Sequence, residues 1–330
     1  MSESNNKKGI ELAYKQDLMD SHTRLLDTQY QGADFSPLNG GRVSSVQIVD
    51  CHDGAPFVSK MTPFLSNPEY EHLFLATGSR FTNVPQLYSY SRVADWRTGH
   101  APDPMQRLTL ANERAAGLIE MEYIPGFTHA SMQEAGMQLD ATVAYARTLR
   151  ELHSVTLTPE FQQEHLDYYP LQGIVAFYEW MKAGVPLEQI FPDYAAYDRI
   201  INEHLDQVDA DNPTQLVTFD CNPNNASYLQ AADTSITAFI FDPGFCATYG
   251  GDPNIDLGFF YRRAIRAQGV LEAFEEGYDT HIDWLAPRVQ LGVVLRSLLT
   301  FKVLHDMDPK SFGKRITRET ETIDTAMQYL

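Results

Sequence analysis

The sequence predicts an α+β protein of two lobes, an antiparallel-sheet lobe over residues 1–125 and a mostly helical lobe over residues 126–330. Up to residue 124, most apolar segments are short or alternate with polar residues, a pattern typical of strands. From residue 137 onward, apolar residues recur at helical spacing. Pro125-Gly126 separates the two patterns, and such a pair is typical of a break between structural elements.

The first lobe opens with a predicted amphipathic helix over residues 9–30. The elements expected after it are strands over 43–49 and 56–61, a helix from about residue 67, and strands over 84–90 and 116–124. Gly40-Gly41 suits a tight turn between two strands, the later of which is the one over 43–49. Lys60 lies among apolar neighbours in the second, and a lysine on an antiparallel strand usually faces solvent.

In the second lobe, residues 137–154 place Leu139, Val143, Ala146, Leu149 and Leu152 on one stripe, which predicts a core helix. Further helices are expected over 171–183, 194–207, 254–285 and 288–306. The three cysteines show neither paired nor metal-type spacing, which favours a reduced, cytoplasmic compartment. We interpret Cys221 as a small buried side chain rather than a nucleophile.

Residues 216–257 contain the most informative pattern. Two short strands, 226–229 and 236–241, are joined by a turn around Asp233 and form a predicted hairpin. A hairpin brings the loop before its first strand close to the loop after its second. Asp220, Asn225 and Asp242 are therefore expected to converge.

Phosphoryl transfer needs an aspartate that can take a hydroxyl proton, together with an Asn and an Asp that can hold magnesium. Turn chemistry alone could explain the Asn, Asp, Pro and Gly residues of these loops. It does not explain why two such loops flank one hairpin at this spacing. The sequence therefore predicts Asp220 as catalytic and Asn225 and Asp242 as magnesium ligands.

Three motifs carry a resemblance to a known family. They are Thr218-Phe219-Asp220-Cys221-Asn222-Pro223-Asn224-Asn225, then Asp242-Pro243-Gly244, then Gly251-Asp252-Pro253-Asn254-Ile255-Asp256-Leu257. They resemble H-G-D-x-H-P-x-N, I-D-F/W-x and G-D-P-x-x-D-L of the aminoglycoside phosphotransferase and choline kinase family. Thr218 and Asn222 stand where that family has His, and Phe219 stands where it has Gly.

The resemblance implies a bilobal protein-kinase-like fold with a five-stranded N-lobe and a small-molecule kinase that uses ATP or GTP with Mg²⁺. Lys60 would hold the nucleotide phosphates and pair with Glu69, with Glu71 as the alternative partner. The segment ending Met121-Glu122-Tyr123 resembles the family hinge, whose backbone would bind the adenine edge. Asp256 would brace the catalytic loop, and His153, in an L-x-x-L-H segment, would be structural.

Net charge is −19, of which residues 1–125 contribute −4 and residues 126–330 contribute −15. This acidity argues against a nucleic-acid partner and favours a hydroxylated, cationic acceptor such as an aminoglycoside, a choline-like amine or an amino sugar. The acidity could equally serve solubility alone. No apolar run reaches membrane-spanning length, so no membrane partner is expected.

Two other functions remain open. The departures at Thr218, Phe219 and Asn222 suggest a pseudokinase that binds nucleotide or a partner without turnover. A metal-dependent hydrolase would instead need clustered histidine ligands, and the ten histidines are scattered along the chain.

Overall fold

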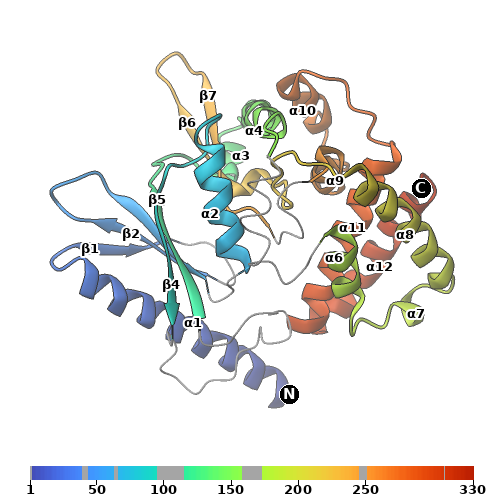
Figure 1. Ribbon diagram of the computed structural model, residues 1–330, viewed down its shortest axis with the longest axis horizontal. Coiled ribbons are helices and arrows are strands. Elements are labelled where there is room, and N and C mark those ends of the chain that lie inside the picture. Colours follow the sequence, from blue (N-terminus) through green and yellow to red (C-terminus); the bar gives the residue numbers. More distant parts are fainter. Residues whose placement is uncertain are drawn as a thin grey trace. The chain divides into compact units, whose positions relative to one another are not determined.

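A computed structural model describes residues 2–38, 44–62, 66–94, 115–157, 173–244, 251–307 and 309–330 (Figure 1). The chain divides into two compact units, the first made of residues 1–79 and 85–124, the second of residues 80–84 and 125–330. This division differs from the predicted lobes by one residue at the boundary and by the excursion of Arg80–Val84 into the second unit. Two contacts hold that excursion: Thr82 donates its hydroxyl to Glu151, and Asn83 accepts from the Ile240 N–H.

The first unit contains a five-stranded antiparallel sheet in the order β1-β2-β3-β5-β4, which confirms the predicted fold class and strand number. Its strands are β1 (Asp34–Pro37), β2 (Ser45–Asp50), β3 (Phe57–Thr62), β4 (Leu87–Ala94) and β5 (Ala115–Glu122). Its helices are α1 (Ser2–Gln29) and α2 (Ser66–Gly78). The expected turn at Gly40-Gly41 lies outside the described residues.

The core of this sheet is built from alternating side chains and from α1. Leu18 of α1 packs in one buried cluster with Met61, Ala116 and Leu118 of the sheet. His22 of α1 is also buried, and its two ring nitrogens lie 2.9 Å from the hydroxyls of Ser45 and Ser59. The amphipathic face predicted for residues 9–30 therefore attaches α1 to β2 and β3.

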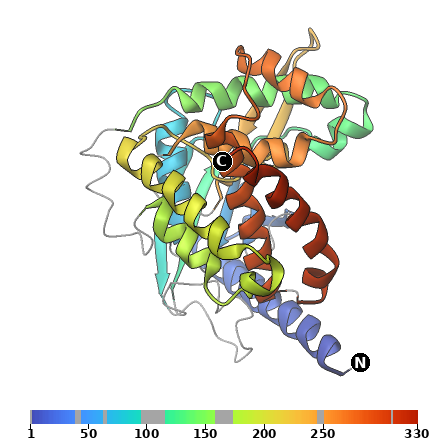
Figure 2. The ribbon, with the colours of Figure 1, turned by 90° about the vertical axis from the view of Figure 1, so that its right-hand side faces the viewer.

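The second unit is mostly helical. Its helices are α3 (His129–Glu134), α4 (Gln138–His153), α6 (Ile174–Lys182), α7 (Leu187–Ile190), α8 (Tyr194–Asp211), α9 (Pro253–Ala264), α10 (Val270–Tyr278), α11 (Pro287–Met307) and α12 (Pro309–Met327). Figure 2 shows α11 and α12 side by side, and α10 packs on α4. One predicted position was wrong: Leu139 of the expected core stripe is 46 % exposed, because α4 buries the neighbouring face that carries Ala141 and Tyr145.

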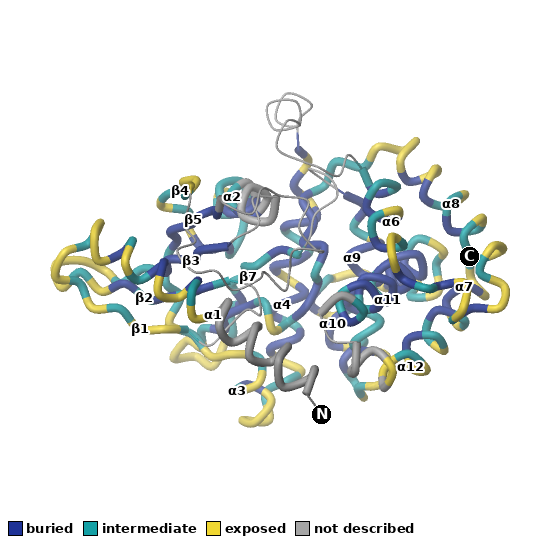
Figure 3. The backbone as a smooth tube through the Cα atoms, turned by 90° about the horizontal axis from the view of Figure 1, so that it is seen from below, coloured by how far each residue is buried: buried dark blue, intermediate teal, exposed yellow. Residues whose placement is uncertain are grey.

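Helices α9 and α11 form the best-buried part of this unit (Figure 3). They approach closely where Gly258 of α9 faces Gly292 of α11. A Cβ added to Gly258 would collide with the Val289 carbonyl oxygen, and one added to Gly292 would collide with the Ile255 carbonyl oxygen. Only glycine allows this backbone contact, which fixes α9 against α11 and so positions the side chains that both helices send toward the loop before β6.

None of the described helices has both the length and the apolar character that crossing a bilayer requires.

Candidate active site

The predicted hairpin is present as β6 (Ala226–Gln230) paired with β7 (Ile236–Ile240), and it brings the expected residues together. Its pairing places the Phe241 N–H 3.0 Å from the Asn225 carbonyl oxygen. The Asn225 Nδ2 atom donates to Asp220 Oδ2 and to the Asp242 carbonyl oxygen, both at 3.1 Å. The side-chain amide of Asn225 thus links the loop before β6 with the end of β7.

The loop that carries Asp220 is braced from α9. Thr218 donates its backbone N–H to Asp256 Oδ2 at 2.7 Å and its hydroxyl to Asp256 Oδ1 at 2.9 Å. His153 Nε2 lies 3.1 Å from Asp256 Oδ2, and His153 Nδ1 lies 2.7 Å from the Tyr278 hydroxyl. Asp256 is 1 % exposed, so these contacts satisfy a buried carboxylate. The prediction that Asp256 braces the loop is confirmed, and the structural role of His153 stays a prediction that these contacts support.

Phe219 adopts a conformation that favours glycine. Its φ is +49°, in the left-handed region, which costs a side-chain-bearing residue about 1–2 kcal/mol. The motif that this loop resembles has Gly at this position, a residue that adopts such a φ without strain. The Phe219 side chain is buried, and a Cβ on Gly251 would lie 2.9 Å from its ring, so aromatic packing offsets the strain.

The two residues after Asp220 are anchored to α4. Tyr145 of α4 donates its hydroxyl to the Cys221 sulfur at 3.6 Å and accepts from the Asn222 N–H at 2.9 Å. Burial raises the pKa of the Cys221 thiol well above its usual value, so the thiol stays protonated and is a poor nucleophile. Cys221 is therefore a buried packing residue, as predicted. Asn222 in turn accepts from the Asn224 N–H at 3.2 Å and caps the turn Pro223–Asn225.

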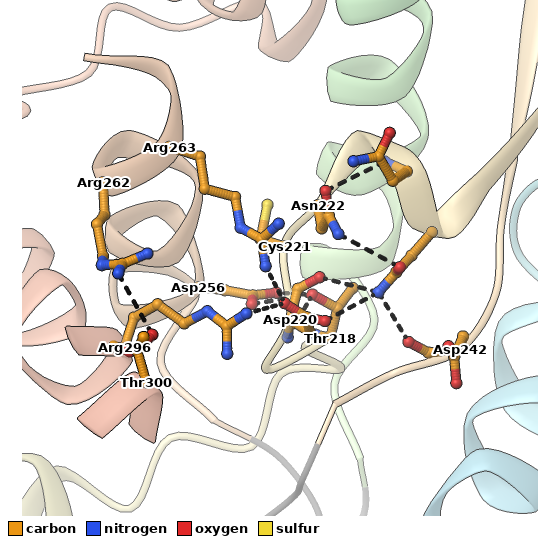
Figure 4. A network of polar contacts seen from close by, with 12 residues as sticks. Thr218, Asp220, Cys221, Asn222, Asp242, Asp256, Arg262, Arg263, Arg296 and Thr300 are labelled. Carbon is orange, nitrogen blue, oxygen red and sulfur yellow. Dashed lines mark hydrogen bonds and ion pairs between the residues drawn. The ribbon is translucent and has the colours of Figure 1, made fainter. Parts of the chain in front are cut away.

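Two arginines that the sequence analysis did not single out contact Asp220. Arg263, near the end of α9, places Nη2 2.8 Å from Asp220 Oδ1, and Arg296, in the middle of α11, places Nη2 3.2 Å from the same oxygen. Figure 4 shows both guanidinium groups reaching Asp220 from one side, with Asp242 on the other side. The side chains of Arg263 and Asp220 are 29 % and 24 % exposed, so the group borders solvent.

Burial lowers the pKa of Arg296, but the guanidinium keeps its charge at neutral pH. Desolvation lowers the pKa of Arg296 to about 10, with nearby Arg263 and Arg262 lowering it further and Asp220 opposing the shift. A pKa near 10 still leaves the guanidinium protonated at neutral pH. The sequence held one signal for this residue, a lone charge inside the apolar run Val293-Val294-Leu295-Arg296-Ser297-Leu298-Leu299. Arg263 gave no comparable signal.

Asn225 and Asp242 offer oxygen ligands suited to magnesium. Mg²⁺ is commonly held by one or two protein oxygens together with substrate phosphates, so a pair of such residues suffices. The two residues are adjacent through the Asn225 amide, and Asn225 Oδ1 makes only a long contact of 3.4 Å with Asn222 Nδ2. No cluster of three or more His, Cys, Asp or Glu with metal-site geometry occurs in the described part of the chain. This donor set fits Mg²⁺.

Lys60 in the first unit forms a buried ion pair. Its Nζ lies 2.6 Å from Glu71 Oε2, and the two side chains are 6 % and 2 % exposed. Lys60 is not on a solvated face, the usual place of a lysine on an antiparallel strand, because β3 lies inside the sheet and α2 covers that face with a carboxylate. The partner in the structure is Glu71, the alternative to Glu69, whose side chain lies outside the described residues.

The predicted hinge residues lie at the end of β5. Met121 pairs with Val58 and Leu87 in the sheet and is buried. Glu122 ends the strand, and its N–H donates to the Gln86 carbonyl oxygen at 2.8 Å. Tyr123 follows directly and is partly exposed. Their contact with a nucleotide base stays a prediction.

Comparison with solved structures identifies the fold. The chain is similar to the GDP and kanamycin complex of APH(2″)-IIia, at a TM-score of 0.60 and 14 % identity over 92 % of this chain and 98 % of that chain. It is also similar to Plasmodium vivax ethanolamine kinase, at 0.56 and 14 % over 92 % and 84 %. A third match is the amicoumacin kinase hAmiN with AMP-PNP, Ca²⁺ and Ami, at 0.56 and 16 % over 95 % and 96 %.

No family model matches the sequence, and no curated protein matches it. Because the structural matches share only 14–16 % identity with this chain, they establish the fold alone. The chain has the protein-kinase-like fold of small-molecule phosphotransferases. Its likeness extends to structures of ethanolamine, aminoglycoside and amicoumacin kinases, and these span nearly all of its length.

Proposed function

We propose that the protein is a nucleotide-dependent phosphotransferase that moves the γ-phosphate to a hydroxyl of a small molecule. The observation that carries the proposal is the meeting of Asp220, Asn225 and Asp242 at one hairpin of a kinase-like fold. A braced loop with a carboxylate at its end provides what phosphoryl transfer asks of a protein, which is mainly positioning and charge stabilisation.

Asp220 is the group we assign to the acceptor. Its carboxylate would accept a hydrogen bond from the acceptor hydroxyl and orient that oxygen toward the γ-phosphorus. As the new O–P bond forms and the bond from the γ-phosphorus to the β–γ bridging oxygen breaks, the hydroxyl proton passes to Asp220 and then to solvent. The Thr218–Asp256 brace and the Asn225 amide fix the carboxylate in place for this step.

Asn225 and Asp242 would hold Mg²⁺, which supplies charge neutralisation at the phosphates when bound. Lys60, oriented by its ion pair with Glu71, would bind the phosphates of ATP or GTP. Met121, Glu122 and Tyr123 would provide the backbone edge for the base. The acceptor would be a small hydroxylated molecule, and a cationic acceptor rests only on the net charge of −19.

The test is nucleotide consumption with a panel of hydroxylated acceptors, with ATP or GTP and with or without Mg²⁺, and with the product identified by ³¹P NMR. Asp220→Asn should lower turnover about a hundredfold or more, because a positioned base contributes roughly that much. Asp206→Asn, an exposed carboxylate on α8, is the matched control and should behave as wild type. Equal turnover in wild type and Asp220→Asn would refute the assignment.

A pseudokinase is the alternative function, and one observation favours it. Asp220 already forms ion pairs with two arginines, which occupy one of its carboxylate oxygens. Thermal unfolding with each nucleotide tests for nucleotide binding. It distinguishes an active kinase or a pseudokinase, both of which bind nucleotide, from a protein that binds no nucleotide. A ligand at a hundred times its dissociation constant adds about 2.7 kcal/mol to stability. Magnesium-dependent stabilisation without turnover on any acceptor would support the pseudokinase.

A further inference from the structure

We propose that Arg263 and Arg296 form a subsite for an anionic group, a carboxylate or phosphate that the acceptor carries near the hydroxyl to be phosphorylated. This inference rests on the proposed phosphotransferase function and specifies its acceptor. It differs from the cationic acceptor that the overall charge favours, because two arginines lie directly beside Asp220.

Arg263 and Arg296 reach the same oxygen, Asp220 Oδ1, from two different helices, while Asn225 contacts Oδ2. Two guanidinium groups carry up to ten N–H donors between them, and a single carboxylate oxygen can satisfy few of these. Among the described residues, Asp220 is the one carboxylate within ion-pair distance of either arginine.

The neighbouring acidic side chains of the described residues do not pair with these two arginines. Arg262, next in sequence, is paired with Glu319, and the two cancel. Asp256 accepts from Thr218 and lies against His153 on the other side of the loop. On the Oδ1 side of Asp220, two arginines therefore share one carboxylate, whereas the Asp242 carboxylate lies on the other side (Figure 4).

Burial makes the incomplete pairing of these two guanidinium groups costly. The Nε atoms of both Arg263 and Arg296 are buried and have no hydrogen-bond partner within the described ranges of the chain. An uncompensated charge that is partly removed from water is destabilising, and a second anion would relieve it. Both side chains keep some exposure, 29 % for Arg263 and 18 % for Arg296, so a small anion can approach the outer faces of the guanidinium groups.

The position of the arginines relative to Asp220 assigns the anion to the acceptor. Asn225 and Asp242, the candidate metal ligands, lie on the Oδ2 side of Asp220, and nucleotide phosphates accompany the metal. Arg263 and Arg296 lie on the opposite, Oδ1 side (Figure 4). An anion bound there would sit beside the acceptor hydroxyl, with its carboxylate or phosphate oxygens matching the guanidinium donors.

The first experiment measures binding without turnover. Thermal unfolding is followed with inorganic phosphate against sodium chloride at equal ionic strength, in wild type, Arg263→Gln, Arg296→Gln and the charge-conserving Arg296→Lys. Arg199→Gln is the control, since Arg199 is an exposed arginine on α8. Phosphate should stabilise wild type, Arg199→Gln and Arg296→Lys, and should stabilise the two Gln variants much less. The Lys variant keeps the test valid where a Gln variant folds poorly.

The second experiment compares acceptors matched in shape, namely glucuronate, glucose and glucosamine, together with glycolate and ethanolamine. The anionic member of each set should have the lowest KM. Its KM should rise about tenfold to a hundredfold in Arg263→Gln, the range expected for losing a charged hydrogen bond, while the KM for nucleotide stays unchanged.

Other outcomes overturn one proposal or the other. A preference for glucosamine and ethanolamine with no phosphate effect would overturn the subsite. Loss of nucleotide affinity in the arginine variants would assign the anion to the nucleotide and overturn the acceptor assignment. Arginine-dependent stabilisation by phosphate without transfer to any acceptor would support the subsite and overturn the phosphotransferase function.

Discussion

Thr218 gives both its backbone N–H and its hydroxyl to the single carboxylate of Asp256, at 2.7 and 2.9 Å. Asp256 belongs to α9, the helix that also carries Arg263. The loop before Asp220 and one of the arginines that contact Asp220 are therefore attached to the same helix. The position of the candidate catalytic carboxylate depends on α9 from both sides.

The first prediction concerns this brace. Asp256→Asn should destabilise the protein by about 3 kcal/mol, because it removes a buried charge that holds two donors of Thr218. Thr218→Val should cost about 1 kcal/mol, since only the hydroxyl contact is lost. Chemical denaturation of both variants measures the difference, with Thr218→Ser as the control that keeps the hydroxyl. Equal costs for Asp256→Asn and Thr218→Val would contradict the brace.

The second prediction concerns the contact between α9 and α11. Gly258→Ala should destabilise the protein by several kcal/mol, roughly 3 or more, because a Cβ there collides with the backbone of α11. Gly313 of α12 is exposed with open space around its Cβ position, so Gly313→Ala should stabilise by about 0.5–1 kcal/mol. Thermal unfolding of the pair measures both signs. A neutral Gly258→Ala would show that the two helices can separate without loss.

The third prediction concerns Phe219. Phe219→Gly restores the residue of the resembled motif and relieves a φ of +49°. It also removes a buried aromatic side chain, which costs about 3–5 kcal/mol against a relief of about 1–2 kcal/mol. We therefore expect net destabilisation by about 2–3 kcal/mol in chemical denaturation. A more stable Phe219→Gly protein would mean that the strain outweighs the packing.

The fourth prediction concerns pH. Burial lowers the pKa of His22 to about 4 from its usual 6.5, so folded His22 is neutral between these values while unfolded His22 takes up a proton. Stability is therefore full above pH 6.5 and falls as the pH drops toward 4, by about 3 kcal/mol from this residue. Hydrogen exchange of β2 and β3 at several pH values should follow this slope. His22→Gln should flatten it, and an unchanged slope would exclude His22 as its source.

Much of the fold was predictable because its patterns are local. The turn signals around residues 226–241 and the alternating apolar residues of the sheet specify strands within a few residues. The convergence of Asp220, Asn225 and Asp242 was predictable for the same reason, since one hairpin carries both flanking loops. Elements defined by neighbours in sequence can be recognised from sequence.

The arginines of the site could not be found in this way. Arg263 and Arg296 meet Asp220 only because α9 and α11 pack through Gly258 and Gly292, a contact between segments far apart in the chain. Lys60 shows the same limit, because β3 is covered by α2 and a strand pattern does not reveal which face a helix will bury. Net charge was a poor guide to the site, where two arginines contact Asp220.

The excursion of Arg80–Val84 into the second unit has a consequence for how the chain is made. Asn83 leaves the ribosome early, yet the N–H that it accepts from belongs to Ile240, which is synthesised much later. The same holds for Thr82 and Glu151. The first unit therefore cannot complete its connection between α2 and β4 during its own synthesis. We expect a nascent chain released after residue 124 to leave this connection open to proteases, and the full-length chain to close it only once β7 has emerged.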